Sequence, residues 1–65
     1  MKRIKQIKGY VIYQQSEAEI IANTNGSTCK YLLYSPDEME QPKGFRYYEF
    51  EADSVKELED FVKCA

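Results

Sequence analysis

The most regular arrangement of potentially reactive side chains in this 65-residue sequence is a serine followed, three positions later, by a glutamate. It occurs three times, and the three serines are nineteen residues apart. Such pairs could mark a site, an internal repeat or helix starts. Ser-x-x-Glu is also the capping box that begins many helices, and each pair here follows a strand-like stretch. We therefore interpret all three as helix starts. The pairs are Ser16–Glu19, Ser35–Glu38 and Ser54–Glu57.

The other residues able to do acid–base chemistry lack suitable partners. The chain has no His, so the commonest general base is missing. Asp37 and Glu38 fit the first turn of a helix, where the helix dipole favours acids. Glu49 and Glu51 share one face of a predicted strand, and we expect that face to be solvated. We therefore expect no enzymatic activity, no catalytic residue and no cofactor.

The two cysteines, Cys29 and Cys64, predict no metal site. With no His, they cannot build an all-Cys or Cys/His zinc site within one chain. No apolar run approaches the ~20 residues of a membrane span. The apolar stretch Tyr10–Tyr13, which follows a basic N-terminus, is too short for a signal peptide. We expect a cytoplasmic protein with reduced thiols and no membrane partner.

Length and composition indicate a single small domain over residues 1–65. Apolar residues make up 43% of the chain and charged residues 31%, which is typical of a folded protein. The net charge is −2, but it is unevenly distributed. All eleven acidic residues lie between Glu17 and Asp60, whereas residues 1–8 form a basic N-terminal arm or edge strand. The basic residues of that segment are Lys2, Arg3, Lys5 and Lys8.

The C-terminal third predicts a strand and then a helix. Residues 45–52 alternate apolar and polar side chains, a period that fits a half-buried strand. Ser54 follows as an N-cap, and an apolar stripe with helical spacing comes after it. The stripe consists of Val55, Leu58, Phe61 and Val62.

The middle third predicts a strand over residues 30–34 that is apolar on both faces and therefore central in the sheet. Ser35 and Pro36 then favour a helix of one or two turns. Residues 41–44, which contain Pro42 and Gly44, predict a turn.

The first third predicts a strand over residues 10–14. Lys8-Gly9 suits a hairpin turn with residues 3–7 as the partner strand, although Ile4 and Ile7 fit a period of two poorly. After Ser16 we expect a short helix closed by Asn25-Gly26. The alternative is a strand over residues 19–24 with a type I′ turn at Asn25-Gly26.

Together these elements predict an α+β fold. Three or four strands form an antiparallel or mixed sheet packed against the C-terminal amphipathic helix, with one or two short helices between strands. The expected core is Val11 or Ile12, Ile20, Leu32 or Leu33, Tyr48, Phe50, Leu58, Phe61 and Val62.

The aromatic content of 14%, with six Tyr and no Trp, is the most distinctive feature of the composition. If one face of the sheet is only partly covered, tyrosines on that face could contact another protein, since Tyr is enriched at interfaces. We expect a small non-enzymatic protein acting through protein–protein contacts, with an unknown partner or as a homodimer. The candidate interaction surface is Tyr10, Tyr13, Tyr31, Tyr34 and Tyr47.

Nucleic acid is the alternative partner, and the acidic balance of the chain disfavours it. In that case Lys2, Arg3, Lys5 and Lys8 would contact phosphates.

Four segments occur in a characteristic order along residues 10–62. They are Tyr10-Val11-Ile12-Tyr13, Tyr34-Ser35-Pro36-Asp37-Glu38-Met39, Lys43-Gly44-Phe45-Arg46 and Glu51-Ala52-x-Ser54-x-x-Glu57-Leu58. In this order the chain resembles short uncharacterised proteins of bacterial and phage genomes. The resemblance implies a bacterial or phage origin and a domain of unknown function. It carries over no catalytic or binding residue.

Overall fold

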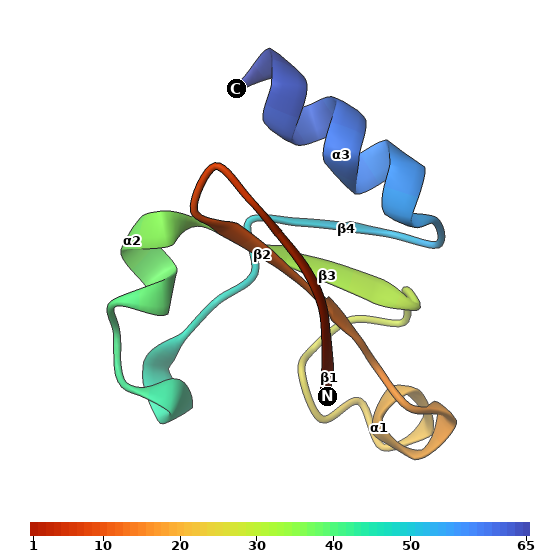
Figure 1. Cartoon of the computed structure of the whole chain (residues 1–65). Helices are drawn as coiled ribbons and strands as arrows, with labels where there is room; N and C mark the ends of the chain where they lie inside the picture. The colour runs from red at the N-terminus through yellow and green to blue at the C-terminus, as the bar shows by residue number, and fades with distance from the viewer.

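The structure, a computed structural model, describes all 65 residues and has the predicted α+β architecture. Four antiparallel strands follow one another across a single sheet in the order β1-β2-β3-β4. The C-terminal helix α3 lies above the sheet in Figure 1, and α1 and the short 3₁₀ helix η1 lie below it. The elements are β1 (Lys2–Ile7), β2 (Tyr10–Gln14), α1 (Glu17–Ile21), β3 (Tyr31–Tyr34), α2 (Pro36–Met39), η1 (Lys43–Phe45), β4 (Phe50–Ala52) and α3 (Val55–Cys64).

The predicted first hairpin is confirmed. Lys8 and Gly9 both have positive φ angles, 51° and 84°, as a two-residue type I′ turn requires. The pairing of β1 with β2 shifts register between Arg3 and Lys5, so Ile4 occupies a bulge. This bulge explains the irregular spacing of Ile4 and Ile7, because one extra residue interrupts the alternation of faces.

The three glycines differ in whether an added Cβ would clash and in whether the backbone has positive φ. Alanine substitutions at these positions should therefore lower the stability of the protein by different amounts. A Cβ at Gly9 would lie 2.9 Å from Cγ of Pro36, on a backbone with positive φ. Gly26 has positive φ but open space, and Gly44 has open space without positive φ.

We expect Gly9→Ala to lower the free energy of unfolding by roughly 1–3 kcal/mol, because alanine is strained on a left-handed backbone. The contact of the new Cβ with Pro36 should lower it further. Gly26→Ala should lower it less than Gly9→Ala, and Gly44→Ala should change it by less than about 0.5 kcal/mol. Urea unfolding of the three variants measures the order. Equal stability of the Gly9 and Gly44 variants would contradict the hairpin geometry.

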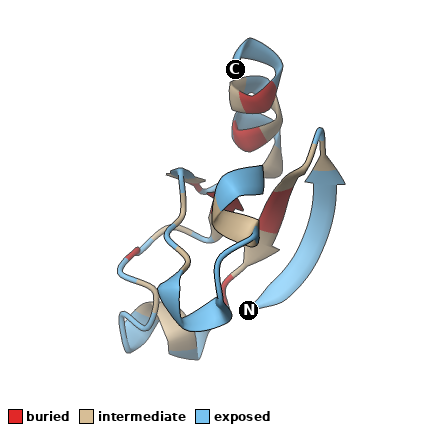
Figure 2. Ribbon diagram, turned by 90° about the vertical axis from the view of Figure 1, so that its left-hand side faces the viewer, coloured by how far each residue is buried: buried red, intermediate tan, exposed pale blue.

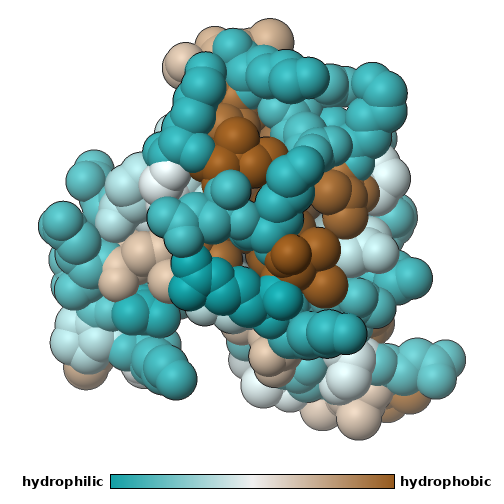
Figure 3. Space-filling view, viewed as in Figure 1, coloured by the Kyte–Doolittle hydropathy of each residue, from teal (hydrophilic) through white to brown (hydrophobic).

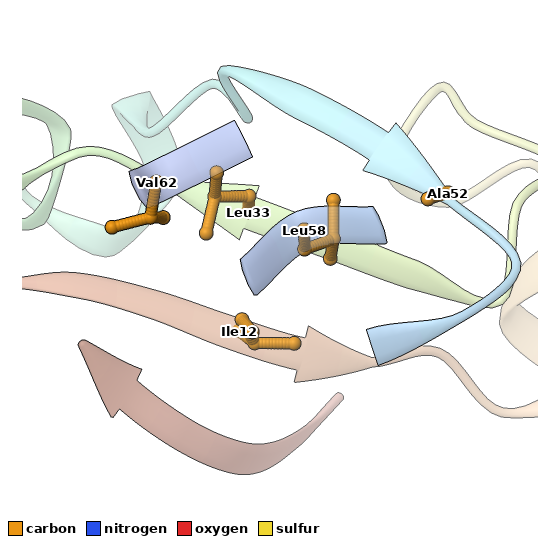
Figure 4. Packing of buried hydrophobic residues seen from close by; sticks show 5 residues of the cluster. All are labelled: Ile12, Leu33, Ala52, Leu58 and Val62. Carbon is orange, nitrogen blue, oxygen red and sulfur yellow. The ribbon is translucent and has the colours of Figure 1, made fainter. Parts of the chain in front are cut away.

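The main core lies between the sheet and α3. Ile12 of β2 and Leu33 of β3 are opposite each other and point toward Leu58 and Val62 of α3 (Figure 4). Ala52 of β4 completes this cluster. The predicted apolar stripe of the C-terminal helix therefore faces the sheet, and its half-buried members pack at the edge of the same cluster.

The second face of the sheet is also largely buried. Val11, Leu32 and Tyr34 alternate with the residues that face α3, and each is buried. Figure 2 shows buried residues on the central strands and on α3, whereas the edge strand β1 is exposed. The loop residues 22–30 and the segment 43–48 lie on the side of the sheet away from α3, and α2 lies beside the sheet next to the turn between β1 and β2 (Figure 1).

The helix at residues 17–21 confirms the helical alternative and excludes the strand over residues 19–24. Its capping box is complete: the Glu19 N–H donates to Ser16 Oγ (3.1 Å) and the Ser16 N–H donates to Glu19 Oε1 (2.9 Å). The hydrogen bond from the Ser16 N–H, followed by one from the N-terminal ammonium, lowers the pKa of Glu19 from 4.5 to about 2. The helix ends earlier than predicted, because Asn23, directly after the C-cap Ala22, already adopts the left-handed conformation, with φ of 53°.

The other two serines cap their helices, but their glutamates do not return the hydrogen bond to the backbone. Ser35 Oγ and Ser54 Oγ each accept from the backbone N–H three residues later. Glu38 instead accepts from the Tyr47 N–H, and Glu57 contacts the Ser54 hydroxyl. The sequence motif therefore identified three helix starts, while only the first pair forms the full capping box.

The strand predicted over residues 45–52 is shorter than expected. Residues 43–45 form η1, and β4 contains only residues 50–52, paired with β3. Three residues expected in the core are less buried than predicted: Tyr48 and Phe61 are half-buried, and Phe50 is 41% exposed while stacking on Phe61. Ile20, also expected in the core, is half-buried on a short helix.

Candidate functional site

A hollow on the sheet face opposite α3 is the best candidate for a functional site, and we name it the tyrosine cleft. Its floor is Tyr13 and Tyr34, its first wall is residues 23–26, and its second wall is residues 43–48; Met1 also lines the smaller of its two hollows. Two hollows of about 240 and 560 Å³ adjoin there and share Tyr34 among their lining residues. Figure 3 shows a notch in the lower part of the surface, between the part around η1 and the part around α1.

The floor of the cleft comes from neighbouring strands. Tyr13 of β2 and Tyr34 of β3 meet edge to face, with ring centroids 5.4 Å apart and an interplanar angle of 86°. Tyr34 is only 4% exposed, and its hydroxyl group makes no hydrogen bond within the protein. Burial raises the pKa of Tyr34 further above neutral pH, and its protonated hydroxyl group is able to donate.

The first wall is held by Gln15, which is 2% exposed. Its Nε2 donates to the carbonyl oxygens of Cys29 (2.7 Å) and Ser27 (3.2 Å). Its Oε1 accepts from Asn25 Nδ2 (2.9 Å), so one side chain holds three positions of the loop. Sequence reasoning missed this residue, because a polar residue after a strand gives no signal that its amide will be buried.

The second wall is attached to α2. Arg46 donates from Nη2 to the carbonyl of Met39 (2.9 Å) and from Nε to the carbonyl of Gln41 (2.8 Å). The Tyr47 N–H donates to Glu38 Oε1 (3.0 Å). The Tyr47 bond occupies a backbone N–H that a longer β4 would need, and all three bonds hold residues 43–48 over the sheet.

A polar cluster joins the two walls at one end of the cleft. The Tyr48 hydroxyl group donates to the carbonyl of Gly26 (3.0 Å), and Ser27 Oγ donates to Glu51 Oε1 (2.7 Å). The Ser27 hydroxyl group, together with Cys29 and Tyr48, lowers the pKa of Glu51. Glu51 is therefore half-buried and bonded, not on the solvated face expected from the sequence.

The same cluster makes Cys29 a poor nucleophile. Burial is the main cause that raises the pKa of its thiol, and the nearby carboxylate of Glu51 adds to the shift. Because the thiolate is the reactive form, this shift makes Cys29 less reactive at neutral pH than an ordinary thiol. Cys29 and Cys64 are both free thiols.

The five tyrosines of the predicted interaction surface do not lie on one face. Tyr13 and Tyr34 form the floor of the tyrosine cleft, and Tyr47, which is 77% exposed, lies on its second wall. Tyr10 and Tyr31 lie on the opposite face and pack against the core cluster beneath α3. The structure thus brings three of the five together.

The four basic residues of the alternative hypothesis are spread along β1 and its turn. Lys5 is paired with Glu59 of α3, and Arg3 donates to Gln6 on the same strand. Lys2 and Lys8 are exposed near opposite ends of β1. Charged side chains on an exposed edge strand also discourage that strand from pairing with another chain. This role explains the basic residues of β1 without a nucleic-acid ligand.

Comparison with known protein families, with curated proteins and with solved structures gives no match to this chain. The resemblance to short bacterial and phage proteins therefore stays a prediction. None of the helices has the length and hydropathy needed to cross a membrane. The structure contains no group of three or more Cys, Asp or Glu side chains able to hold a metal ion.

Proposed function

We propose that this is a small non-catalytic binding protein that holds a segment of another protein in the tyrosine cleft. The observation that carries the proposal is the cleft itself, a hollow of about 560 Å³ adjoining one of about 240 Å³. Its lining contains no carboxylate or thiol, so it offers neither an ionised general base nor a strong nucleophile. The same lining has tyrosines, amides and cations suited to contact with a peptide.

The walls of the cleft are fixed before any ligand arrives. Gln15 anchors the first wall and Arg46 the second through side-chain hydrogen bonds. A preorganised site loses less conformational entropy on binding, and tyrosines provide contact area at low entropic cost. Beside the cleft, Phe45 and Tyr47 expose 70% and 77% of their surface, which adds apolar area for a partner.

A segment of another protein fits these features better than nucleic acid. The basic residues of β1 do not form one surface, and Lys5 is already paired with Glu59. A second copy of this chain is the other possible occupant, and the experiment below identifies it.

Blocking the cleft tests the proposal. Gly44 lies on the second wall, and a Cβ there meets no atom within 4 Å, so Gly44→Trp adds an indole ring without a backbone clash. We expect the wild-type protein to enrich peptides from a random-peptide display library. Gly44→Trp should bind the enriched peptides about tenfold more weakly or worse, because the loss of one well-placed contact region costs more than 1.4 kcal/mol.

Gly44→Ala is the matched control and should bind the same peptides as the wild type. Urea unfolding must show that the Trp variant is folded. Enrichment of no peptide, or equal binding by the Trp variant, would overturn the proposal. Light scattering at several protein concentrations tests for a dimer. If the wild type is a dimer that Gly44→Trp dissociates, the occupant of the cleft is a second copy of this chain and not another protein.

A further inference from the structure

The charge of the tyrosine cleft is opposite to that of the whole chain. Eleven residues of the protein are acidic and nine are basic, yet the cleft is lined by Lys43 and Arg46 and by no acidic side chain. In a protein with net charge −2, a lining with two cations and no carboxylate is complementary to a negatively charged group. The Glu51 carboxylate, in the polar cluster at one end of the cleft, already accepts a hydrogen bond from Ser27 Oγ.

Three donors in the cleft remain free for such a group. Lys43 Nζ has no hydrogen bond or ion pair in the protein. Arg46 uses Nε and Nη2 on main-chain carbonyls, which leaves Nη1 available. The hydroxyl group of Tyr34 has no protein partner, and all three residues line both hollows of the cleft.

The chemistry of these donors suits a carboxylate. A guanidinium group and an ammonium group supply charge-assisted hydrogen bonds, which are about twice as strong as neutral ones. The Arg46 guanidinium is already oriented by its two bonds to the carbonyls of Met39 and Gln41, so little further rotamer freedom is lost on binding. The protonated Tyr34 hydroxyl group adds a neutral donor from the floor.

We propose that the segment bound in the tyrosine cleft carries an acidic side chain, Asp or Glu, whose carboxylate is held by Lys43, Arg46 and Tyr34. This inference rests on the proposed function, because it names the chemistry of the same site.

The charges outside the cleft favour a short acidic segment over a long polyanion. Lys5 and Lys56 are paired with Glu59 and Asp60, and the N-terminal ammonium is 3.0 Å from Glu19 Oε2. A nucleic acid extending beyond the cleft would find the cations Lys5, Lys56 and the N-terminal ammonium already paired with carboxylates. A single acidic side chain, by contrast, can be bound by the donors that line the cleft alone.

Charge reversal in the cleft tests the inference with the same random-peptide library as the probe. We expect peptides enriched on the wild type to contain several times more Asp and Glu than the unselected library. Lys43→Glu should bind them about tenfold more weakly, because like charges now face each other. Lys63→Glu is the matched control, because it makes the same charge change on an exposed position of α3, away from the cleft, and should bind them as the wild type does.

The possible failures are distinguishable. Enriched peptides that are neutral, yet lost on Gly44→Trp, would leave the proposed function standing and overturn the acidic ligand. Acidic peptides that bind Lys43→Glu and Lys63→Glu equally would overturn the assignment of Lys43. A mixed-sequence single-stranded DNA oligonucleotide that displaces the peptides, with affinity falling steeply as salt rises, would overturn it in favour of a phosphate ligand. If no peptide is enriched at all, the proposed function fails together with the inference.

Discussion

Leu58→Ala is expected to unfold a large fraction of the protein at room temperature. Leu58 is fully buried and packs with Ile12 and Leu33 at the centre of the core between α3 and the sheet (Figure 4). Removing a buried leucine side chain costs about 2–5 kcal/mol, through lost burial and the cavity left behind. A domain of this size has a core that supplies roughly 3–5 kcal/mol in total, so the substitution removes most of its stability.

Circular dichroism during urea and thermal unfolding measures this loss. Ile21→Ala is the control, because Ile21 is 83% exposed on α1 and its truncation should change the free energy of unfolding by less than about 0.5 kcal/mol. If Leu58→Ala unfolded at the same urea concentration as Ile21→Ala, the packing of α3 on the sheet would be wrong.

Gln15→Leu is expected to have the second-largest effect, and it acts on both stability and binding. The substitution keeps the size of the side chain but leaves the carbonyls of Ser27 and Cys29, and the amide of Asn25, without this partner. An unsatisfied buried group costs about 1–3 kcal/mol. Water can hydrogen-bond to some of the groups that lose this partner, which reduces the cost. We therefore expect the free energy of unfolding to fall by about 2–4 kcal/mol in total.

The same change should loosen the first wall of the tyrosine cleft. At temperatures where the variant is still folded, we expect weaker binding of the peptides selected on the wild type, because the wall is no longer held in place. Gln14→Leu is the matched control one residue earlier, since the Gln14 side chain makes no hydrogen bond in the protein. Equal stability of the Gln14 and Gln15 variants would show that the buried amide does not hold the loop.

The elements that could be predicted from the sequence are those encoded by local pattern. The apolar stripe around Leu58 predicted α3 and its buried face, and Lys8-Gly9 predicted the first hairpin. Ser16, Ser35 and Ser54 predicted where three helices begin. In each case the signal lies within a few residues, where period and capping chemistry act directly.

What could not be predicted depends on contacts between residues distant in the chain. The shortening of β4 follows from the bond of the Tyr47 N–H to Glu38, and Arg46 holds the same segment against Met39. The first wall of the cleft depends on Gln15, whose partners are 12 and 14 residues away in the sequence. A polar side chain buried by such contacts has the same local sequence signal as one in solvent.

The tyrosines illustrate the limit within the sheet. Tyr10 and Tyr13 are three residues apart on one strand, and Tyr31 and Tyr34 are three apart on the next, so each pair must divide between opposite faces. The sequence therefore allowed two groupings of tyrosines. The connections between strands decide which face packs against α3 and which packs against the loops that form the cleft. These connections have no periodic sequence pattern from which the choice could be predicted.

The most direct test of the central claim is to locate a bound peptide on the ¹⁵N-labelled protein by NMR. The measured quantity is the change in each backbone amide chemical shift when the peptide is added. A peptide selected from the random library is added to the wild-type chain. We expect the largest shifts at Gly26, Tyr34 and Gly44, which surround the tyrosine cleft. Largest shifts along β1 and α3, at Lys5 and Lys63, with the cleft amides unchanged, would contradict the account.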